Sequence, residues 1–261
     1  MMLDKKALQA GTSHELGQNF SKAFEIQYSD ENNNLAHPFQ TSWGVSTRLI
    51  GMIIMAHGDD QGLKLPPAIA PTQVVIIPII PKNADSEKIL KIANQIKEML
   101  SDFRVHLDDR EGVSPGFKFN EWELKGVPIR LELGPKDIEN NSVVVARRDI
   151  QNSKTSIPIN TLDSEITSLL DTIQNEMLKV SEQFLTDNTS HAESMDELLK
   201  QLQDSDGFVS CYWSESKEDE LRVKEQTKAT IRCYPLEHTN EMSSVNKPEI
   251  QGKFAIFSKS Y

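Results

Sequence analysis

The sequence predicts a multidomain protein that combines the α/β and α+β classes. With 261 residues the chain is long for one domain and sufficient for two. The β-branched run Val74–Ile80, bounded by prolines, predicts a central strand. Residues 162–186 carry an apolar stripe at helical spacing. A central strand with helices and further strands around it is typical of a mixed α/β domain.

The first seventy residues contain short apolar segments separated by polar loops. Strands are expected around Ala23–Ile26 and Gly51–Met55. The Arg48–His57 segment is apolar enough to be a buried strand or a buried helix, and its periodicity does not choose between them. Several prolines then interrupt the chain, so a domain boundary is expected near residue 70. We therefore expect domains at residues 1–70, 71–160 and 161–261.

The middle of the chain continues from the Val74–Ile80 strand into a helix. Ser86 is a candidate N-cap for this helix, which is expected to run to Phe103 because its apolar residues recur every three to four positions. Strands are expected at Val127–Leu133 and Ser142–Ala146. Together these elements predict a mixed sheet with helices packed on it.

The last third begins with the clearest helix, at residues 162–186. Its apolar stripe is expected to pack in a core and consists of Ile166, Leu169, Leu170, Ile173, Met177, Val180 and Phe184. A second helix is expected at Met195–Leu202. The tail, Gly207–Tyr261, is expected to mix short strands with charged turns.

Composition excludes several classes of protein. A hydrophobic fraction of 38% and a charged fraction of 26% fit a globular protein, and no apolar run is long enough to cross a membrane. Two cysteines do not make a disulfide framework, so a cytoplasmic location is expected. The net charge of −11 argues against nucleic acid, but residues 71–150 carry 12 basic and 13 acidic groups. The middle of the chain can therefore present a local basic face.

Two segments near the start carry groups suited to a small polar ligand. The first, LQAGTSHELGQNF from Leu8 to Phe20, places hydroxyl, amide and imidazole groups between two turn-forming glycines. Alone it reads as a polar loop with a structural histidine. The second is QTSWGVSTRLIGMIIMAHGDDQGLKLPP, from Gln40 to Pro67. Its Arg48 lies in apolar surroundings, where a surface ion pair is the less favoured interpretation.

These segments closely resemble class II prolyl-tRNA synthetases of the archaeal and eukaryotic type, and Gln40–Pro67 matches the third signature motif of that class. The resemblance covers essentially the whole chain. It implies part of an antiparallel catalytic sheet, an α/β anticodon-binding domain with a mixed sheet, and a small α/β C-terminal domain. The first two class II motifs are expected upstream of Met1. We therefore expect that this chain alone does not form prolyl-adenylate.

The resemblance implies a role for each matching residue. ATP would be held by Gln9, Thr12, Ser46 and Arg48, with Gln9 reaching the magnesium that accompanies ATP. Proline would be held by His14, Ser42, Trp43 and Gly44, although core packing is the alternative for Trp43. Arg48 is the expected catalytic residue, because a permanent cation with a rigid donor fork stabilises charge that develops on pyrophosphate. His57-Gly58-Asp59-Asp60 is a weak metal signal and is interpreted as a structural turn.

The middle domain resembles the family's anticodon-binding domain in SPGFKFNEWELKGVPIR, LGPKDIE and VVVARRD. The expected tRNA-binding residues are Lys118, Glu121, Glu123, Arg130, Lys136 and Arg147, with Arg148 also able to reach phosphates. The glutamates can accept hydrogen bonds from guanine, and Phe117, Phe119 and Trp122 can stack on an unpaired base. Proline anticodons share guanines at their second and third positions. Without the resemblance, mixed Lys and Glu would indicate a solvated face.

The C-terminal third departs from the family pattern of a four-cysteine zinc site. Ser214, Asp219, Met242 and Val245 stand at the expected cysteine positions. We therefore predict that zinc is absent and that core packing stabilises this domain. Cys211 and Cys233 are interpreted as ordinary buried thiols. The resemblance also implies that Tyr261 folds back toward the catalytic part, with a frayed tail as the alternative.

The sequence therefore predicts a proline–tRNA ligase, which activates proline with ATP and Mg²⁺ and transfers it to proline tRNA, acting as a homodimer. Two alternatives remain. The chain is a non-catalytic tRNA-binding fragment or paralogue, or it is one half of a split synthetase. The absence of two motifs favours the alternatives, whereas the presence of Gln9, Thr12, His14 and Arg48 favours the ligase.

Overall fold

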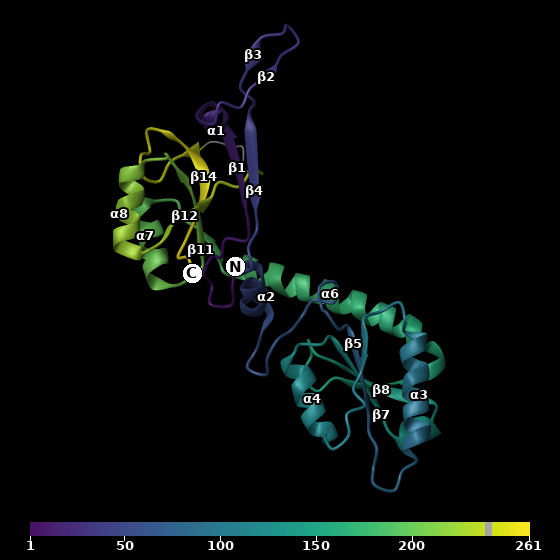
Figure 1. The fold of residues 1–261 in the computed structure, drawn as a ribbon. Coiled ribbons are helices and arrows are strands. Elements are labelled where there is room, and N and C mark those ends of the chain that lie inside the picture. The colour runs from purple at the N-terminus through teal and green to yellow at the C-terminus, as the bar shows by residue number, and fades with distance from the viewer. Residues whose placement is uncertain (238–241) are drawn as a thin grey trace. The chain divides into compact units, whose positions relative to one another are not determined.

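The computed structural model describes residues 1–237 and 242–261. It divides the chain into two compact units (Figure 1). We call residues 56–188 the middle unit. We call residues 1–55 together with 189–261 the split unit, because two separate stretches of sequence build it. The mixed α/β architecture predicted from the sequence is confirmed. No helix in the described ranges is both long enough and apolar enough to cross a membrane.

The middle unit is built on a five-stranded sheet in the order β6-β5-β7-β8-β9. The strands are β5 (Val74–Pro78), β6 (Val105–Leu107), β7 (Ile129–Leu133), β8 (Ser142–Arg147) and β9 (Lys154–Pro158). β5 pairs in parallel with β6 and β7, whereas β7, β8 and β9 pair antiparallel. The helices are α3 (Ser86–Met99), α4 (Pro115–Leu124), α5 (Pro135–Glu139) and α6 (Leu162–Asp187), and the 3-10 turn η1 (Ile159–Thr161) precedes α6.

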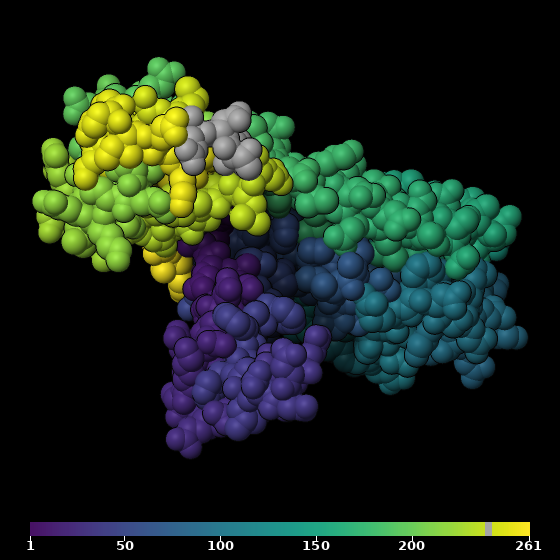
Figure 2. All heavy atoms as spheres, turned by 90° about the horizontal axis from the view of Figure 1, so that it is seen from above, coloured from purple at the N-terminus to yellow at the C-terminus, as the bar shows by residue number. Residues whose placement is uncertain are grey.

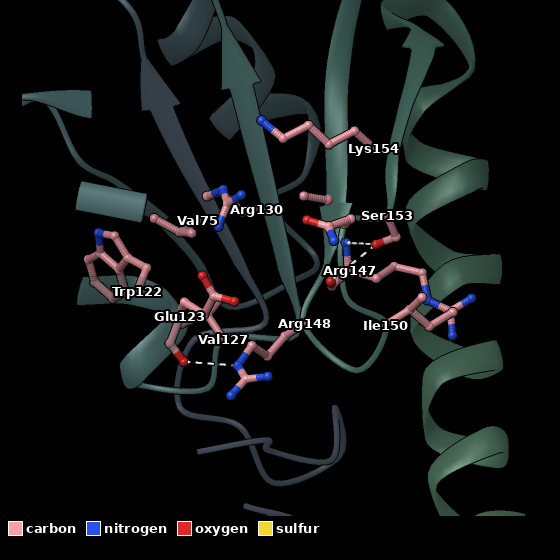
Figure 3. A pocket seen from close by; sticks show the side chains of 12 residues that line it. Val75, Trp122, Glu123, Val127, Arg130, Arg147, Arg148, Ile150, Ser153 and Lys154 are labelled. Atoms are coloured by element: carbon pink, nitrogen blue, oxygen red, sulfur yellow. Dashed lines mark hydrogen bonds between the residues drawn. The ribbon is translucent and has the colours of Figure 1, made fainter. Parts of the chain in front are cut away.

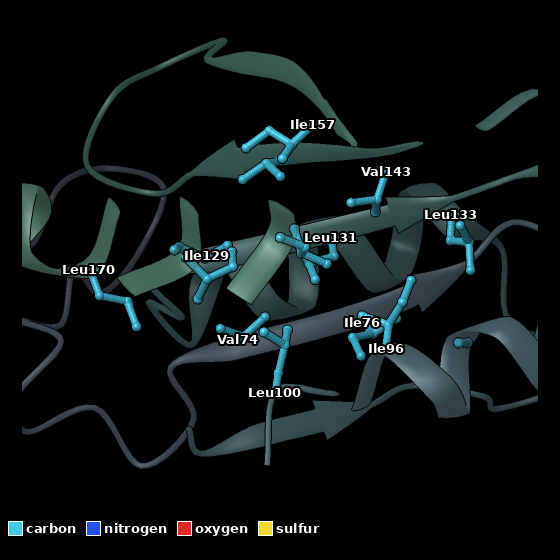
Figure 4. Close-up of a cluster of buried hydrophobic side chains, with 14 of the residues drawn as sticks. Val74, Ile76, Ile96, Leu100, Ile129, Leu131, Leu133, Val143, Ile157 and Leu170 are labelled. Carbon is cyan, nitrogen blue, oxygen red and sulfur yellow. The ribbon is translucent and has the colours of Figure 1, made fainter. Parts of the chain in front are cut away.

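The apolar run of β5 is continuous because this strand is buried on both faces. Val74 and Ile76 lie in a large core cluster with residues of α3 and α6, which Figure 4 shows in close-up. Val75 and Ile77 lie in a second cluster with Trp122 of α4. The sheet therefore separates α4 from α3 and α6, because successive side chains of a strand point to opposite faces.

The split unit holds a second core built from its C-terminal part. Its main sheet has the order β10-β11-β14-β12, and β13 pairs with β14. The strands are β10 (Thr189–His191), β11 (Phe208–Trp213), β12 (Thr230–Cys233), β13 (Met242–Ser243) and β14 (Gln251–Ser258). The helices α7 (Met195–Asp204) and α8 (Lys217–Thr227) supply Leu198, Leu202 and Val223 to this core.

The N-terminal part of the split unit contributes two small antiparallel ribbons and two helices. The longer ribbon pairs β1 (Thr12–Gly17) with β4 (Gln40–Gly44), and the shorter pairs β2 (Tyr28–Ser29) with β3 (Leu35–Ala36). The helices are α1 (Asn19–Ala23) and α2 (Arg48–His57). Most side chains of this part are exposed, and its purple atoms lie at the surface in Figure 2.

Several local predictions are wrong for identifiable reasons. Gly51–Met55 is not a strand, because the ten residues of Arg48–His57 form helix α2 directly after a turn. Ala23–Ile26 is not a strand either, because α1 ends at Ala23 and a turn follows. Helix α3 is capped by Asp85 rather than Ser86, since the Asp85 carboxylate accepts from the backbone N–H of Lys88 at 3.0 Å.

Three further corrections concern side chains and the tail. Val180 is 69% exposed, so the buried stripe of α6 ends near Met177. The tail contains helix α8 as well as strands. Cys211 is buried, and burial raises the pKa of its thiol to about 12, but Cys233 is exposed rather than buried. The remaining predicted elements agree with β5, β7, β8, α6 and α7 to within a few residues.

Candidate functional site

The two motif segments of the split unit meet in the β1–β4 ribbon. Antiparallel pairing sets Thr12 opposite Gly44 and His14 opposite Ser42. Residues that are about thirty positions apart in the sequence therefore lie side by side. One open cavity of about 380 Å³ forms here. Its lining comprises Gln9, Ala10, Gly11, Thr12, His14, Ser42, Gly44, Val45, Ser46 and Arg48.

Seven of the eight residues expected to hold ATP and proline line this cavity. The exception is Trp43, which pairs with Ser13 in the ribbon and is 80% exposed. Because side chains alternate along a strand, Trp43 points away from the side of β4 that carries Ser42 and Gly44. The structure therefore places Trp43 neither in the cavity wall nor in a core.

The polar side chains of this cavity make few hydrogen bonds within the protein. Gln9 donates through Nε2 to Thr12 Oγ1 at 2.9 Å, and the Arg48 backbone N–H donates to Ser46 Oγ at 3.3 Å. Among the residues that the structure describes, no carboxylate pairs with the Arg48 guanidinium. Its charge and five N–H donors are therefore available to an anion.

The C-terminus of the chain reaches the same region. The backbone N–H of Tyr261 donates to Ala7 O at 3.1 Å, and that of Ala7 donates to Lys259 O at 3.0 Å. Tyr261 also lines a cavity of about 470 Å³ together with Gln9 and Arg48. The chain end is thus paired with the segment that leads into the cavity and is not a frayed tail.

The middle unit carries a small cationic pocket of about 110 Å³, drawn in Figure 3. Three of the residues expected to bind tRNA line it, namely Glu123, Arg130 and Arg147. Two further cations, Arg148 and Lys154, line the same pocket. Four cations around one glutamate make a pocket that favours an anionic ligand carrying hydrogen-bond donors.

An acidic residue and an aromatic ring hold the cations of this pocket in place. Glu132, which is 5% exposed, pairs with Arg130 at 3.0 Å and with Lys154 at 2.8 Å. The Arg130 guanidinium lies 4.5 Å from the ring centroid of Phe119, and the Lys154 ammonium lies 5.4 Å from it. Arg147 pairs with Asp149 and Glu176, and the hydrogen bonds that it donates to Asp149 are the main cause that raises the Arg147 pKa. These pairings orient the cations before any ligand arrives.

Three other residues expected to bind tRNA lie outside this pocket. Lys118 is 4% exposed and donates through Nζ to Asp108 O at 2.9 Å. Glu121 pairs with Arg110 and Lys125, each at 2.7 Å, and the hydrogen bonds from Lys125 and Arg110 lower the Glu121 pKa. Lys136 lies exposed on α5. Lys118 is therefore not available to a phosphate. Its bonds to Asp108 instead anchor helix α4.

Asp108 is the centre of that anchor. Its carboxylate accepts from Arg110 at 2.7 and 2.8 Å and from Trp122 Nε1 at 2.8 Å. Burial opposes ionisation of this carboxyl, but these hydrogen bonds and the charge of Lys118 outweigh it and hold its pKa well below the ordinary range. Asp108 therefore holds helix α4 in place through Lys118 and Trp122, and α4 also carries Glu123.

Sequence reasoning missed Lys154 and Glu132 as site residues. Both become neighbours of Arg130 only through strand pairing, because β7 pairs with β8 and β8 pairs with β9.

Two of the four positions predicted to have lost zinc ligands, Ser214 and Asp219, belong to a hydrogen-bonded cluster around Asn246. Asn246 donates through Nδ2 to Ser214 Oγ at 2.8 Å and to Asp219 Oδ2 at 2.9 Å, and its Oδ1 accepts from the Ser214 backbone. The cluster joins the end of β11, the start of α8 and the 244–248 turn. No group of three or more metal-ligating side chains occurs among the described residues.

Comparisons with known proteins assign the two units to one family. Residues 73–169 match the model for the anticodon binding domain, and residues 195–261 match the model for the prolyl-tRNA synthetase C-terminal region. The proline–tRNA ligase of Roseiflexus sp. (strain RS-1) is 48% identical over 92% of this chain and 50% of its own length. The chloroplastic/mitochondrial enzyme of Arabidopsis thaliana is 48% identical over the whole chain and 49% of its own length.

Solved structures agree with these matches. The crystal structure of prolyl-tRNA synthetase from Cryptosporidium parvum complexed with halofuginone and AMPPNP has a TM-score of 0.90 and 39% identity. The match extends over 99% of the present chain and 55% of the Cryptosporidium parvum chain. The complex with L-proline and AMP has a TM-score of 0.90 and 40% identity, over 98% and 56% of the two chains. This chain spans about half the length of the curated relatives it matches. It belongs to the prolyl-tRNA synthetase family and corresponds to that family's C-terminal portion.

Proposed function

We propose that this chain acts as the C-terminal portion of a proline–tRNA ligase. That enzyme joins proline to ATP, releases pyrophosphate, and transfers the prolyl group to proline tRNA. The observation that carries the proposal is the pocket of Arg130, Arg147, Arg148 and Lys154 around Glu123. This pocket lies inside the region that matches the anticodon-binding family model. The resemblance of relatives named proline–tRNA ligase supports the same reaction.

The cavity of the β1–β4 ribbon is proposed to hold ATP and proline. Arg48 would bind the phosphates, with Gln9, Thr12 and Ser46 beside it, and His14, Ser42 and Gly44 would contact proline. Because the Gln9 Nε2 donates to Thr12, its carbonyl oxygen is left as a hard ligand of the kind magnesium prefers. Magnesium would neutralise phosphate charge when it is bound with ATP. A contact between Trp43 and proline stays a prediction, because Trp43 does not line this cavity.

The middle unit is proposed to read the anticodon. Glu123 can accept from guanine N1–H and N2–H₂, while Arg130 and Lys154 contact phosphates or base acceptors. Lys136 and Arg147 are proposed to make outer phosphate contacts, whereas Lys118 and Glu121 position α4. The domain boundaries near residues 70 and 160, the homodimer and the cytoplasmic location stay predictions.

Binding of an anticodon stem–loop tests this proposal. The full chain is expected to bind a proline-type stem–loop and to lose about tenfold or more in affinity when both shared guanines are replaced by adenines. Arg130→Gln is expected to weaken binding by a similar factor, and Lys91→Gln, at an exposed position of α3, is the matched control. Equal binding of both stem–loops by the unmodified chain would contradict anticodon reading.

A split-enzyme or tRNA-binding role is the second candidate. The observation that favours it is the exposure of the ATP and proline residues, because Gln9, His14 and Arg48 are all exposed. Acyl-adenylate chemistry benefits from an enclosed site with little water. Adding a separately produced N-terminal half of a relative is expected to restore proline-dependent ATP–pyrophosphate exchange if the chain is half of a split enzyme. A pure binding protein would gain none.

A further inference from the structure

Asp59 ties the segment after helix α2 to a wall of the cationic pocket. We call this segment, residues 58–65, the strap. The Asp59 carboxylate accepts from both terminal nitrogens of Arg148, at 2.6 and 3.0 Å. Arg148 is only 7% exposed, although its partner lies 89 positions earlier in the sequence. A bidentate pair of this kind fixes the orientation of its two partners as well as their distance.

Two further donors hold the Asp59 carboxylate in this position. The Lys64 ammonium lies 3.0 Å from Oδ2, and the Gln61 backbone N–H donates to Oδ1 at 3.0 Å. The hydrogen bonds from Arg148 are the main cause that holds the pKa of Asp59 well below its ordinary range. Asp59 is therefore ionised at neutral pH and presents a fixed anion to Arg148.

Arg148 carries this restraint to Glu123, the acceptor proposed to read guanine. Its Nε donates to the Glu123 backbone carbonyl at 3.0 Å, a bond drawn in Figure 3. Glu123 is the penultimate residue of α4, so its carbonyl is one of the last four, which lack the regular helical partner. Arg148 also directly follows Arg147, the last residue of β8, which lines the pocket. Asp59 itself does not line the pocket, yet it fixes the guanidinium that joins two of its walls.

Backbone contacts hold the strap against the same end of α4. The Leu63 N–H donates to Leu124 O at 3.0 Å, and the Leu65 N–H donates to Gly126 O at 3.2 Å. A Cβ at Gly62, which has a φ of +127°, would lie 2.6 Å from the Leu124 backbone. A Cβ at Gly126, which has a φ of +72°, would lie 2.7 Å from the Leu63 backbone. The strap is therefore a close support for the end of α4, at a distance that only glycine allows.

We propose that Asp59 is a positioning residue for anticodon reading: through Arg148 it holds Glu123 where that glutamate meets guanine. The inference rests on the proposed function and adds to it a residue of the segment that resembles the third class II motif. Phosphate contacts contribute affinity for any sequence, whereas contacts to base edges set the specificity. Loss of Asp59 is therefore expected to reduce the discrimination between guanine and adenine more than it reduces binding.

The ratio of two stem–loop affinities tests this role on the full chain. Each variant is titrated with the proline-type stem–loop and with the loop that carries adenines in place of the two shared guanines. Asp59→Asn leaves Arg148 without its carboxylate. We expect the affinity ratio to fall from about tenfold or more to about twofold or less. The affinity for the adenine loop should change by less than about twofold, because the phosphate contacts remain.

Asp60→Asn is the matched control. It removes the same charge at the next position, which is exposed and has no ion-pair partner within the described chain. Any general effect of one negative charge fewer on binding of an anionic loop therefore appears in both variants. The affinity ratio of Asp60→Asn should equal that of the unmodified chain.

Arg148→Lys separates action through Arg148 from a loss of stability. It keeps the positive charge but has neither the donor fork nor the Nε that reaches Glu123. It should lower the affinity ratio as much as Asp59→Asn does, and it tests the same link if Asp59→Asn does not fold. In the double variant the ratio should fall no further, because the interaction is already lost. Melting temperatures establish that every titration is made on folded protein.

The outcomes distinguish this inference from the proposed function. An affinity ratio for Asp59→Asn or for Arg148→Lys that equals that of Asp60→Asn overturns the positioning role and leaves anticodon reading intact. Losses that add in the double variant overturn it as well, because the two residues then act separately. Equal binding of both loops by the unmodified chain contradicts the proposed function itself.

Discussion

The middle unit and the β1–β4 ribbon use similar apolar residues in opposite ways. In β5 the residues Val74 to Ile77 are 0% exposed. At the end of β4, Trp43 is 80% exposed and Val45 is 76% exposed, and helix α2 buries none of its ten residues. The middle unit thus closes its own core, whereas the ribbon presents apolar and polar groups together to the surroundings.

The two candidate sites differ in the same sense. Ion pairs and the Phe119 ring fix the cations of the middle unit. In the ribbon cavity one side-chain hydrogen bond joins Gln9 to Thr12, and Arg48 has no partner carboxylate among the described residues. The cations of the proposed anticodon pocket are therefore oriented by the protein itself, whereas the residues proposed to hold ATP and proline are exposed.

The largest contrast should appear in core stability. Leu131→Ala removes a fully buried side chain of β7 and is expected to lower the free energy of unfolding of the middle unit by about 2–5 kcal/mol. Val45→Ala, at an exposed position, should change it by less than about 0.5 kcal/mol. Denaturant titration of both variants measures the difference. Comparable losses would show that the ribbon is as tightly packed as the sheet.

The buried ion network gives the next largest effect. Asp108→Asn leaves buried Lys118 without its anion, removes one of the two carboxylates that bind Arg110, and is expected to cost about 3 kcal/mol at neutral pH. Because the folded-state pKa of Asp108 lies below its ordinary value of about 4, its stabilisation is present above that pH and is lost as pH falls below it. Urea titrations at pH 7 and pH 3 should therefore give a smaller difference at pH 3. A pH-independent difference would exclude an ionised Asp108.

A moderate effect is expected where the aromatic ring orients the cations. Phe119→Leu removes the surface on which Arg130 and Lys154 lie, and each such contact is worth about 0.5–1 kcal/mol. We expect a three- to tenfold loss of stem–loop affinity. Phe117→Leu is the control, because Phe117 is 60% exposed and lies outside the pocket. An equal loss in both variants would argue against orientation by Phe119.

The smallest effect is expected at Arg48. Arg48→Ala should leave the unfolding free energy unchanged within about 0.5 kcal/mol, because the exposed side chain has no carboxylate partner in the described chain. Its stem–loop affinity should equal that of the unmodified chain. A clear loss of stability, seen by thermal unfolding, would mean that the arginine is structural.

The elements that could be predicted from sequence are those whose pattern is set by burial. The continuous run of β5 and the stripe of α6 are such cases. Helix α8 was missed because Lys217–Thr227 is dominated by charged side chains and buries only Val223 and Thr227. Helix α4 was missed because its residues lack a clear stripe. Its start is marked instead by Ser114, whose hydroxyl accepts from Phe117 N–H, and by the following proline.

The residues of the candidate sites likewise differ in whether a local sequence pattern marks them. Gln9, Thr12 and Arg48 belong to local motifs, so sequence could single them out. Lys154 and Glu132 depend on strand register, and the Asp59–Arg148 pair joins residues 89 positions apart. Lys118 was expected to bind tRNA, but it is buried, and Asp108 supplies the anionic partner that its burial requires.

The proposed function holds that the middle unit reads the anticodon and that the open cavity of the β1–β4 ribbon does not activate proline on its own. The most direct test measures stem–loop binding and proline-dependent ATP–pyrophosphate exchange on one preparation of the full chain. The account predicts guanine-dependent binding without exchange. Exchange at a rate close to that of complete prolyl-tRNA synthetases, or exchange without guanine-dependent binding, would contradict it.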